Sequence, residues 1–402
     1  MKFGKQPIHD LPLSDPMILG AYAQQLQREA EARGETLPPA LRLHVGEPGF
    51  RTPEHIRRAA SETISSEPLT YGPPEGWPWL RSLLSGKIAR VNGYQVEPDN
   101  IAITQGGTGA LLAAMLATVD SGDEVLIPDP CWPHYYMQLA TSSAIPVPYP
   151  LDPCNEWQPD PEQLERLVTP RTRMLIINTP GNPTGAVLPP TMIDHLLNFA
   201  RRHDLYLLAD ECYDEIVFEG QHVSPGTMLE AGEMETGRFI GVYTFSKTYA
   251  MTGWRVGYVV AGRELLNTIV SVLCASHTSV STIVQRAGEA ALSGSQDCAV
   301  EMREAYRARR DLAVRLLKEH GRYTYTPHGA FYALIDISGP NGEPRHSRQF
   351  TLDLLRERNV SVAAGSGFGH VSESYVRISL AASETEIERG IREICAFAGR
   401  AG

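Results

Sequence analysis

Short apolar segments alternate with helical patterns between residues 100 and 261, and this alternation limits the fold more than any other feature of the chain. Residues 173–178 read RMLIIN, and an unbroken apolar run of this kind is typical of a parallel strand buried on both faces. Strands that alternate with helices predict an α/β fold with a doubly wound, mostly parallel sheet. We expect further strands at 100–104, 124–128, 205–209, 239–243 and 256–261, and helices at 107–119, 132–140 and 190–203.

The pattern changes after about residue 290, where a long charged helix is predicted at 297–320. The chain has 402 residues, which corresponds to two or three domains at about 150 residues each. We therefore expect a large domain at 51–290, a small α+β domain at 291–402, and an N-terminal segment at 1–50 that packs with the small domain and a partner subunit. The expected elements of the small domain are strands at 323–326, 330–336, 360–363 and 375–380, and helices at 348–358 and from 383.

Charge and cysteine content exclude several classes of protein. The 36 basic and 47 acidic residues give a net charge of −11, which argues against a nucleic-acid or anionic-membrane partner. No run reaches the roughly 20 apolar residues of a membrane span, and residues 1–10 contain no apolar core of a secretory signal. The six cysteines lack C-x-x-C spacing and the 12 histidines form no H-E-x-x-H motif. We expect free thiols in a reducing cytoplasm and no metal site.

Polar residues follow successive strands of the predicted sheet, at the edge where open α/β sheets bind ligands. Asn182, Asp210 and Lys247 each come at or just after a strand end, and residues 105–109 (QGGTG) join a strand to a helix. Glycines and a helix N-terminus suit a phosphate, although a tight turn would use the same residues. Taken singly, the three polar residues could cap a turn, cap a helix or be solvated. Their joint occurrence at successive strand ends indicates a ligand site.

These motifs resemble those of the fold type I pyridoxal-phosphate enzymes, within the class I and II aminotransferases. The resemblance rests on NPTG at 182–185, on SK at 246–247 followed by GWRVGY at 253–258, and on LHVGEPGF at 43–50 and VRIS at 376–379. The chain is most similar to the subgroup that contains bacterial aspartate, alanine, aromatic and arginine:pyruvate aminotransferases. The resemblance implies a large cofactor-binding domain with the seven-stranded type of sheet, pyridoxal 5′-phosphate as cofactor, and a homodimer.

The resemblance also implies roles for the residues at the strand ends. Lys247 is expected to form a Schiff base with the cofactor and to move a proton between Cα of the substrate and C4′. Asp210 is expected to face the pyridine nitrogen, because a carboxylate there keeps the ring protonated and makes it a better electron sink. Asn182 and Tyr213 are expected to donate to the 3′-oxygen, and Trp132 to stack on the ring.

The phosphate and the substrate carboxylate have expected partners of their own. The resemblance places the phosphate at the helix N-terminus, against Arg255, and it places Tyr71 at the site of the neighbouring subunit. Arg377 is expected to grip the α-carboxylate with its planar fork, helped by Asn182 and the backbone N–H of Gly46. The other expected phosphate ligands are Gly107, Thr108, Ser246 and Thr244.

Three positions depart from the pattern of the family. Thr244 stands where relatives often have serine, and Gly49 stands where they often have Asp or Asn. Thr108 replaces a lysine that several dicarboxylate-using relatives carry, so we expect that aspartate is not the preferred amino donor. The segment from Leu11 is expected to cover the site, where Asp15 would either meet a basic substrate tail or cap the helix that begins there.

The predicted function is an aminotransferase that moves an amino group from an L-amino acid to a 2-oxo acid by ping-pong chemistry. The same scaffold hosts C–S lyases and amino-acid cyclases or synthases, and motifs alone do not separate these reactions. A cofactor-binding regulator would need a DNA-binding domain, for which about 50 residues before the large domain leave little room. A nicotinamide-dependent oxidoreductase would need a G-x-G-x-x-G fingerprint after a strand, which the sequence lacks.

Overall fold

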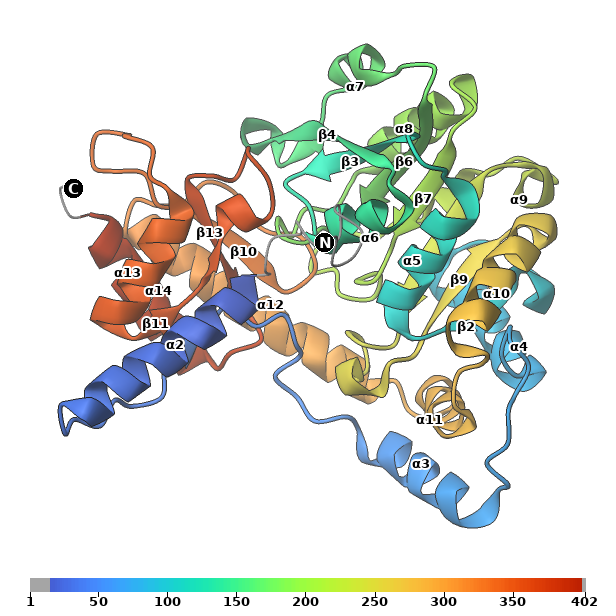
Figure 1. The fold of residues 1–402 in the computed structure, drawn as a ribbon, viewed down its shortest axis with the longest axis horizontal. Coiled ribbons are helices and arrows are strands. Elements are labelled where there is room, and N and C mark those ends of the chain that lie inside the picture. The colour runs from blue at the N-terminus through green and yellow to red at the C-terminus, as the bar shows by residue number, and fades with distance from the viewer. Residues whose placement is uncertain (1–14, 400–402) are drawn as a thin grey trace, which may run out of the picture.

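A computed structural model of the chain describes residues 15–399 (Figure 1). Its large sheet has eight strands in the order β2-β9-β8-β7-β6-β3-β4-β5. The pairs β3–β4, β3–β6, β6–β7 and β7–β8 are parallel, whereas β9 runs antiparallel to β2 and β8. The strands are β2 (Ile101–Thr104), β3 (Glu124–Asp129), β4 (Ile145–Asp152), β5 (Gln158–Pro159), β6 (Thr172–Asn178), β7 (Tyr206–Asp210), β8 (Phe239–Thr244) and β9 (Gly257–Ala261).

The predicted doubly wound α/β fold is confirmed, with eight strands because the two-residue β5 pairs with the outer edge of β4. Side chains alternate along β6, so Leu175 and Ile177 pack on one face and Met174 and Ile176 on the other. One face is covered by α5 (Gly106–Thr118), α6 (His134–Ser142) and α10 (Arg263–His277). The other is covered by α4 (Pro78–Lys87), α8 (Pro190–Arg202) and α11 (Thr282–Ser293), and α3 (Glu54–Ser66) packs on α11.

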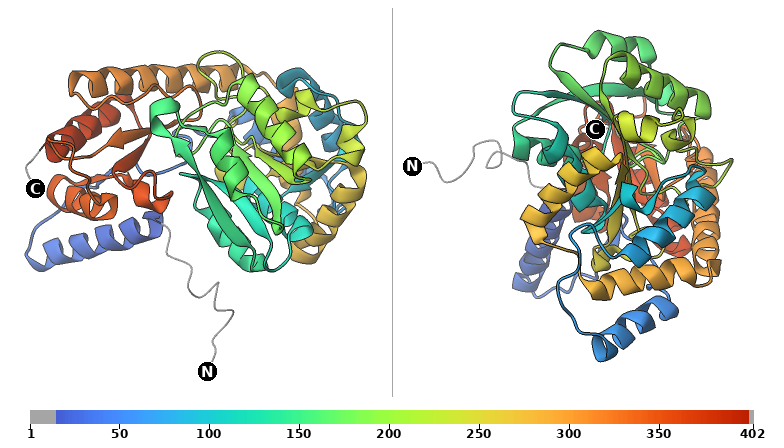
Figure 2. Two further views of the ribbon diagram at one scale, coloured as in Figure 1. Left: turned by 90° about the horizontal axis from the view of Figure 1, so that it is seen from above. Right: turned by 90° about the vertical axis from the view of Figure 1, so that its right-hand side faces the viewer.

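A smaller, three-stranded antiparallel sheet has the order β10-β13-β12. Beside it, β1 (Leu41–Arg42) pairs in parallel with β11 (Val360–Ser361) in a separate two-stranded sheet. The helix α12 (Asp297–Glu319) runs along one side of the molecule, and α2 (Asp15–Ala32) lies on the opposite side (Figure 2). The remaining elements are β10 (Tyr332–Asp336), β12 (Ala363–Ala364), β13 (Tyr375–Ser379), α13 (Ser347–Arg358) and α14 (Glu384–Ala398).

Two expected strands of the small domain differ from the structure. The strand expected at 323–326 is wrong: the segment is irregular, because Pro327 ends it and the buried Tyr325 packs edge-on against Trp157 of the large domain at 6.0 Å. The strand expected at 360–363 is split into β11 and β12, which join different sheets. The expected domain boundaries near 50 and 290 stay predictions.

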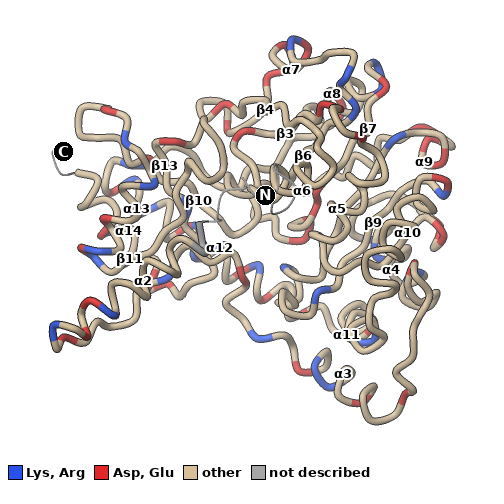
Figure 3. Tube along the Cα trace, viewed as in Figure 1, with Lys and Arg blue, Asp and Glu red and all other residues tan. Residues whose placement is uncertain are grey.

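Short elements connect the larger ones, and charged residues of both signs are spread over the outside of the molecule (Figure 3). Within residues 15–399, no helix combines the length and the apolar character that a bilayer span requires. The short elements are α7 (Pro161–Leu167), α9 (Glu233–Thr236), the π-helical turn η1 (Ile88–Asn92) and the 3₁₀ turns η2 (Pro98–Asn100), η3 (Pro153–Asn155), η4 (Pro225–Met228), η5 (Thr252–Trp254) and η6 (Gly365–Gly367).

Candidate active site

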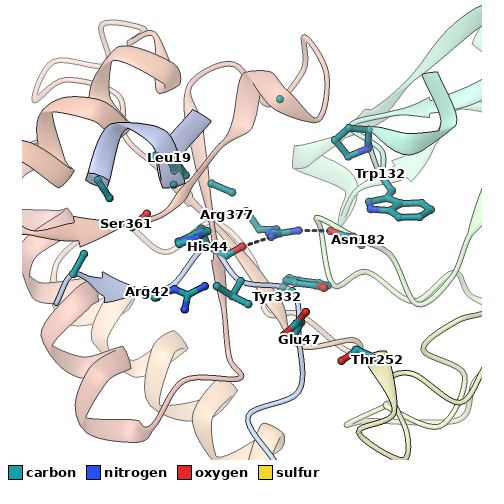
Figure 4. A pocket seen from close by; sticks show the side chains of 18 of the residues that line it. Leu19, Arg42, His44, Glu47, Trp132, Asn182, Thr252, Tyr332, Ser361 and Arg377 are labelled. Carbon is teal, nitrogen blue, oxygen red and sulfur yellow. Dashed lines mark hydrogen bonds between the residues drawn. The ribbon is translucent and has the colours of Figure 1, made fainter. Parts of the chain in front are cut away.

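The carboxyl ends of the large sheet face the small sheet across a cavity of about 1160 Å³. Asn182 follows β6, Asp210 ends β7, Lys247 follows β8, and Arg377 comes from β13 of the small sheet. The structure therefore brings together residues that are distant in the sequence, such as Asn182 and Arg377, which are 195 positions apart (Figure 4). The other expected site residues that line the cavity are Gly46, Gly107, Thr108, Trp132, Tyr213, Thr244, Ser246 and Arg255.

Two expected features of the site lie outside this cavity or outside the described residues. Tyr71 does not line this cavity: it lies between α3 and α4, and its side chain is 85% exposed in the single chain. The segment from Leu11 lies outside the described residues. Asp15 is the first residue of α2, but its side chain also lies outside the description, so neither of its two expected roles is tested.

Asp210 is a buried carboxyl group at the inner end of the cavity, with an exposed fraction of 4%. Tyr135 Oη donates to it at 2.6 Å, and the Cys212 backbone N–H donates at 3.2 Å. Burial raises the pKa of Asp210, and the hydrogen bonds from Cys212 and Tyr135 oppose that rise. Within the described chain, no lysine, arginine or histidine forms an ion pair with this carboxyl group. A cationic group of a ligand would therefore match it.

Lys247 and Tyr213 are held by residues of distant segments. Lys247 Nζ donates to the carbonyl oxygen of Gly46 at 2.9 Å and lies 5.8 Å from the ring centres of Tyr213 and Phe331. The hydroxyls of Tyr213 and Tyr332 share a hydrogen bond of 2.9 Å. The amine at the end of β8 is thereby placed against the N-terminal segment and against β10.

The start of α5 has the features of an anion site. Gly106 has φ = +69°, and a Cβ there would lie 2.7 Å from Arg255 Nη2. Arg255 itself has φ = +57°, an uncommon backbone conformation for a non-glycine residue. Its Nη1 donates to Thr252 O at 2.8 Å, and Thr244 Oγ1 donates to Ser246 Oγ at 2.9 Å. Free helix N–H groups, a guanidinium and two hydroxyls suit a phosphate.

Arg377 presents a fixed guanidinium at the other side of the cavity. Its Nη1 donates to Asn182 Oδ1 at 2.9 Å and its Nη2 donates to His44 O at 2.8 Å (Figure 4). The group lies 4.3 Å from the ring centre of Tyr332 and 4.8 Å from that of Phe368, and the side chain is largely buried. A planar donor fixed in this way is suited to a carboxylate.

Several site residues that the sequence predicts are in contact with aromatic residues that it does not predict. Trp132 stacks on His134 with ring centres 4.1 Å apart and planes at 11°, and burial lowers the pKa of that histidine. Tyr135 lies one helical turn beyond Trp132 on α6, a spacing that could have suggested it. Tyr332 is 119 residues from its partner Tyr213, and no local pattern marks it.

Basic side chains outnumber acidic ones around the cavity, although the whole chain has a net charge of −11. The acidic side chains in the lining are Glu29, Glu47 and Asp210. The basic ones are Arg33, Arg42, Lys247, Arg255, Arg356 and Arg377. The cavity is therefore suited to anionic ligands.

Comparison with known proteins identifies the family. The family model described as aminotransferase class I and II matches residues 38–394. The chain belongs to the class I and II aminotransferases. It is 38% identical over 362 residues to an aspartate/prephenate aminotransferase of Thermus thermophilus, which covers 89% of this chain and 91% of that protein. It is 36% identical over 354 residues to aromatic-amino-acid aminotransferase 2 of Thermococcus litoralis, covering 87% and 90%.

Solved structures show the same fold. The structure of Thermus thermophilus aspartate aminotransferase with maleate matches this aminotransferase with a TM-score of 0.88 and 34% identity, covering 99% of this chain and 100% of that one. The aminotransferase uses pyridoxal phosphate. The described residues suit that group, because a buried carboxyl group without a basic partner, an anion cradle and a lysine line one cavity.

Proposed function

We propose that this aminotransferase transfers the amino group of an L-amino acid to a 2-oxo acid in two half-reactions, and that aspartate is not its preferred donor. The observation that carries the proposal is the Arg377 guanidinium, which Asn182 and His44 hold in the cavity that also contains Lys247. Thr108 supports the statement about donors, because it lines the cavity without a charge. The names of several relatives favour aspartate instead, so the donor is decided by experiment.

The proposed roles follow from the contacts of each residue. Arg377 binds the α-carboxylate of either substrate and orients Cα, while Asn182 fixes the guanidinium. Asp210 pairs with the ring nitrogen of pyridoxal phosphate, which when bound supplies an electron sink for negative charge at Cα. Lys247 attaches the cofactor and, as a free amine, takes the proton from Cα. The remaining proposed cofactor ligands are Gly107, Thr108, Trp132, Asn182, Tyr213, Thr244, Ser246 and Arg255.

We also propose that the enzyme acts as a homodimer in the cytoplasm. Tyr71 is exposed in the single chain, and Ile64 and Leu69 nearby are exposed apolar residues. A partner subunit that covers this surface would bury them and would bring Tyr71 to the phosphate of the neighbouring site. All six cysteines are free thiols, which agrees with a reducing compartment.

The test is the absorbance spectrum of the purified enzyme during single half-reactions. Amino acids are added one at a time without an oxo acid, and the cofactor band is expected to shift to that of its aminated form and to return when a 2-oxo acid is added. Release of ammonia without dependence on an oxo acid would indicate a lyase instead. A kcat/KM for aspartate above those for neutral, aromatic and basic donors would overturn the statement about donors. The Lys247→Ala variant is the control that should lose the band of the attached cofactor.

A further inference from the structure

The extended segment that begins with β1 and leads to Gly46 also directs two side chains into the cavity. Leu41 and Leu43 point into the core of the small domain, so the alternation of an extended strand sends Arg42 and His44 to the opposite face, where both line the cavity (Figure 4). β1 pairs with β11 in a register that sets Arg42 opposite Ser361, which lines the same part of the cavity. One cation, one imidazole and one hydroxyl therefore share a wall.

Two buried side-chain atoms of this wall have no hydrogen-bond partner among residues 15–399. His44 is 8% exposed and Ser361 is 3% exposed, yet His44 Nδ1 and Ser361 Oγ are buried without a hydrogen bond. The Arg42 guanidinium forms no hydrogen bond or ion pair in the described chain. Buried polar atoms are normally paired, so His44 Nδ1 and Ser361 Oγ, beside the exposed guanidinium of Arg42, are arranged for a ligand that the described residues do not supply.

Other arginines in the cavity lining differ in this respect. Arg33 pairs with Glu35 at 3.1 Å, and Arg356 Nε donates to Tyr22 Oη at 2.6 Å. Glu29 on α2, an acidic residue of the same lining, accepts from Gln25 Nε2 at 2.8 Å. Unlike Arg33 and Arg356, Arg42 therefore has a guanidinium without a hydrogen-bond or ion-pair partner among the described residues.

Electrostatics favour an anion over a cation at this wall. Burial, and then the charge of Arg42, lowers the pKa of His44 to about 4, and the charge of Arg377 adds to this lowering while the Ser361 backbone opposes it. His44 is consequently neutral at pH 7 and serves as a polar partner rather than as a charge. A carboxylate suits the combination, because it accepts two hydrogen bonds from a guanidinium and further bonds from a hydroxyl or an imidazole N–H.

We propose that Arg42, His44 and Ser361 form a second carboxylate subsite, separate from the α-carboxylate site at Arg377. Residues 42 and 44 are two positions apart in an extended strand, about 7 Å, and the carbonyl of His44 is already bound to Arg377. A substrate that used both sites would need a side chain longer than that of aspartate. The inference that one substrate uses both sites rests on the proposed function. A free carboxylate, in contrast, could bind the subsite without any turnover.

The first experiment compares acidic donors with neutral donors of similar length, glutamate with norvaline and 2-aminoadipate with norleucine. In Arg42→Ala the ratio of kcat/KM for the acidic to the neutral donor is expected to fall at least tenfold. Arg33→Ala is the matched control, because it removes the same charge from a paired arginine in the same cavity lining, and its ratio should change less than threefold. If Arg42→Ala does not fold, the same ratio is measured in Arg42→Lys and Ser361→Ala.

The second experiment measures binding of glutarate and pentanoate to the holoenzyme by calorimetry, without an amino donor. Glutarate is expected to bind more tightly than pentanoate, and Arg42→Ala but not Arg33→Ala should weaken glutarate at least tenfold. A change in the kinetic ratio identifies the far carboxylate of the substrate as the ligand. A change in glutarate affinity alone identifies a free carboxylate. No change in either overturns the subsite, whereas a cofactor band that no donor shifts would refute the proposed function instead.

Discussion

Gly46→Ala tests the packing around Lys247 more directly than any substitution of the lysine itself. A Cβ at residue 46 would lie 2.7 Å from Tyr332 Oη but 3.6 Å from Tyr332 Cζ, so only the hydroxyl obstructs it. That hydroxyl is bound to Tyr213 Oη at 2.9 Å inside a buried cluster and has little freedom to move. Overpacking of this kind costs about 1–3 kcal/mol.

A double-mutant cycle isolates this cost. Tyr332→Phe alone loses one hydrogen bond, worth about 1 kcal/mol. In the double variant Gly46→Ala/Tyr332→Phe the new methyl group meets only ordinary contacts. The double variant should therefore be about 1–2 kcal/mol more stable than the sum of the two single effects predicts. Independent sites add to within about 0.5 kcal/mol, so the coupling is measurable. The free energy of unfolding is measured in urea for all four proteins at one protein concentration.

The same variants are compared in the amino-donor half-reaction, where the coupling should reappear as a partial recovery of kcat/KM. Gly86→Ala in α4 is the control, because a Cβ there meets no atom within 4 Å. Additive effects of the two substitutions would refute the reasoning. Gly46→Ala would then act through the backbone rather than through the Tyr332 hydroxyl.

Three further predictions concern the protonation of His44, the guanidinium of Arg377 and the homodimer. The pKa of His44 is about 4, below its ordinary 6.5, so as the pH falls the unfolded chain takes up this proton before the folded chain does. The free energy of unfolding should therefore fall by about 3 kcal/mol between pH 6.5 and pH 4. His44→Asn should remove this contribution, as measured by urea titrations at pH 7 and pH 4.5. Arg377→Lys should lower kcat/KM about 30- to 150-fold, because one charge-assisted bond and its geometry are lost at about 2–3 kcal/mol, while the cofactor spectrum is unchanged. Mixed dimers of Lys247→Ala and Tyr71→Ala subunits should regain about half of the activity if Tyr71 serves the neighbouring site, and no gain would show that it does not.

The large sheet and the residues at its strand ends could be predicted from the sequence, because both depend on local patterns. Asn182, Asp210 and Lys247 follow runs of apolar residues, and parallel strands bring their carboxyl ends to one edge. Strand β4 escaped prediction because Pro146, Pro148 and Pro150 interrupt it. The structure accepts them because successive prolines fall on alternate residues of a strand whose outer side pairs only briefly with β5.

The partners of the site residues were beyond local reasoning. Tyr332 contacts Tyr213, Gly46 and Arg377 only because β10 and the N-terminal segment pack together. The strand expected at 323–326 failed for a related reason, since Tyr325 makes a tertiary contact with Trp157 and the segment joins no strand ladder. Contacts across hundreds of residues depend on topology, which the sequence pattern of any one segment does not contain.

The pairing of β1 with β11 has a consequence for synthesis on the ribosome. Leu43 N–H donates to Ser361 O and Leu43 O accepts from Ser379 N–H, so residues 41–43 lie between partners that are made more than 300 positions later. The large sheet can form while translation continues, but the segment that carries Arg42, His44 and Gly46 must wait for residues 361–379. Leu43 therefore lacks these partners until β11 and β13 have been made, and the cavity that Arg377 lines is complete only then.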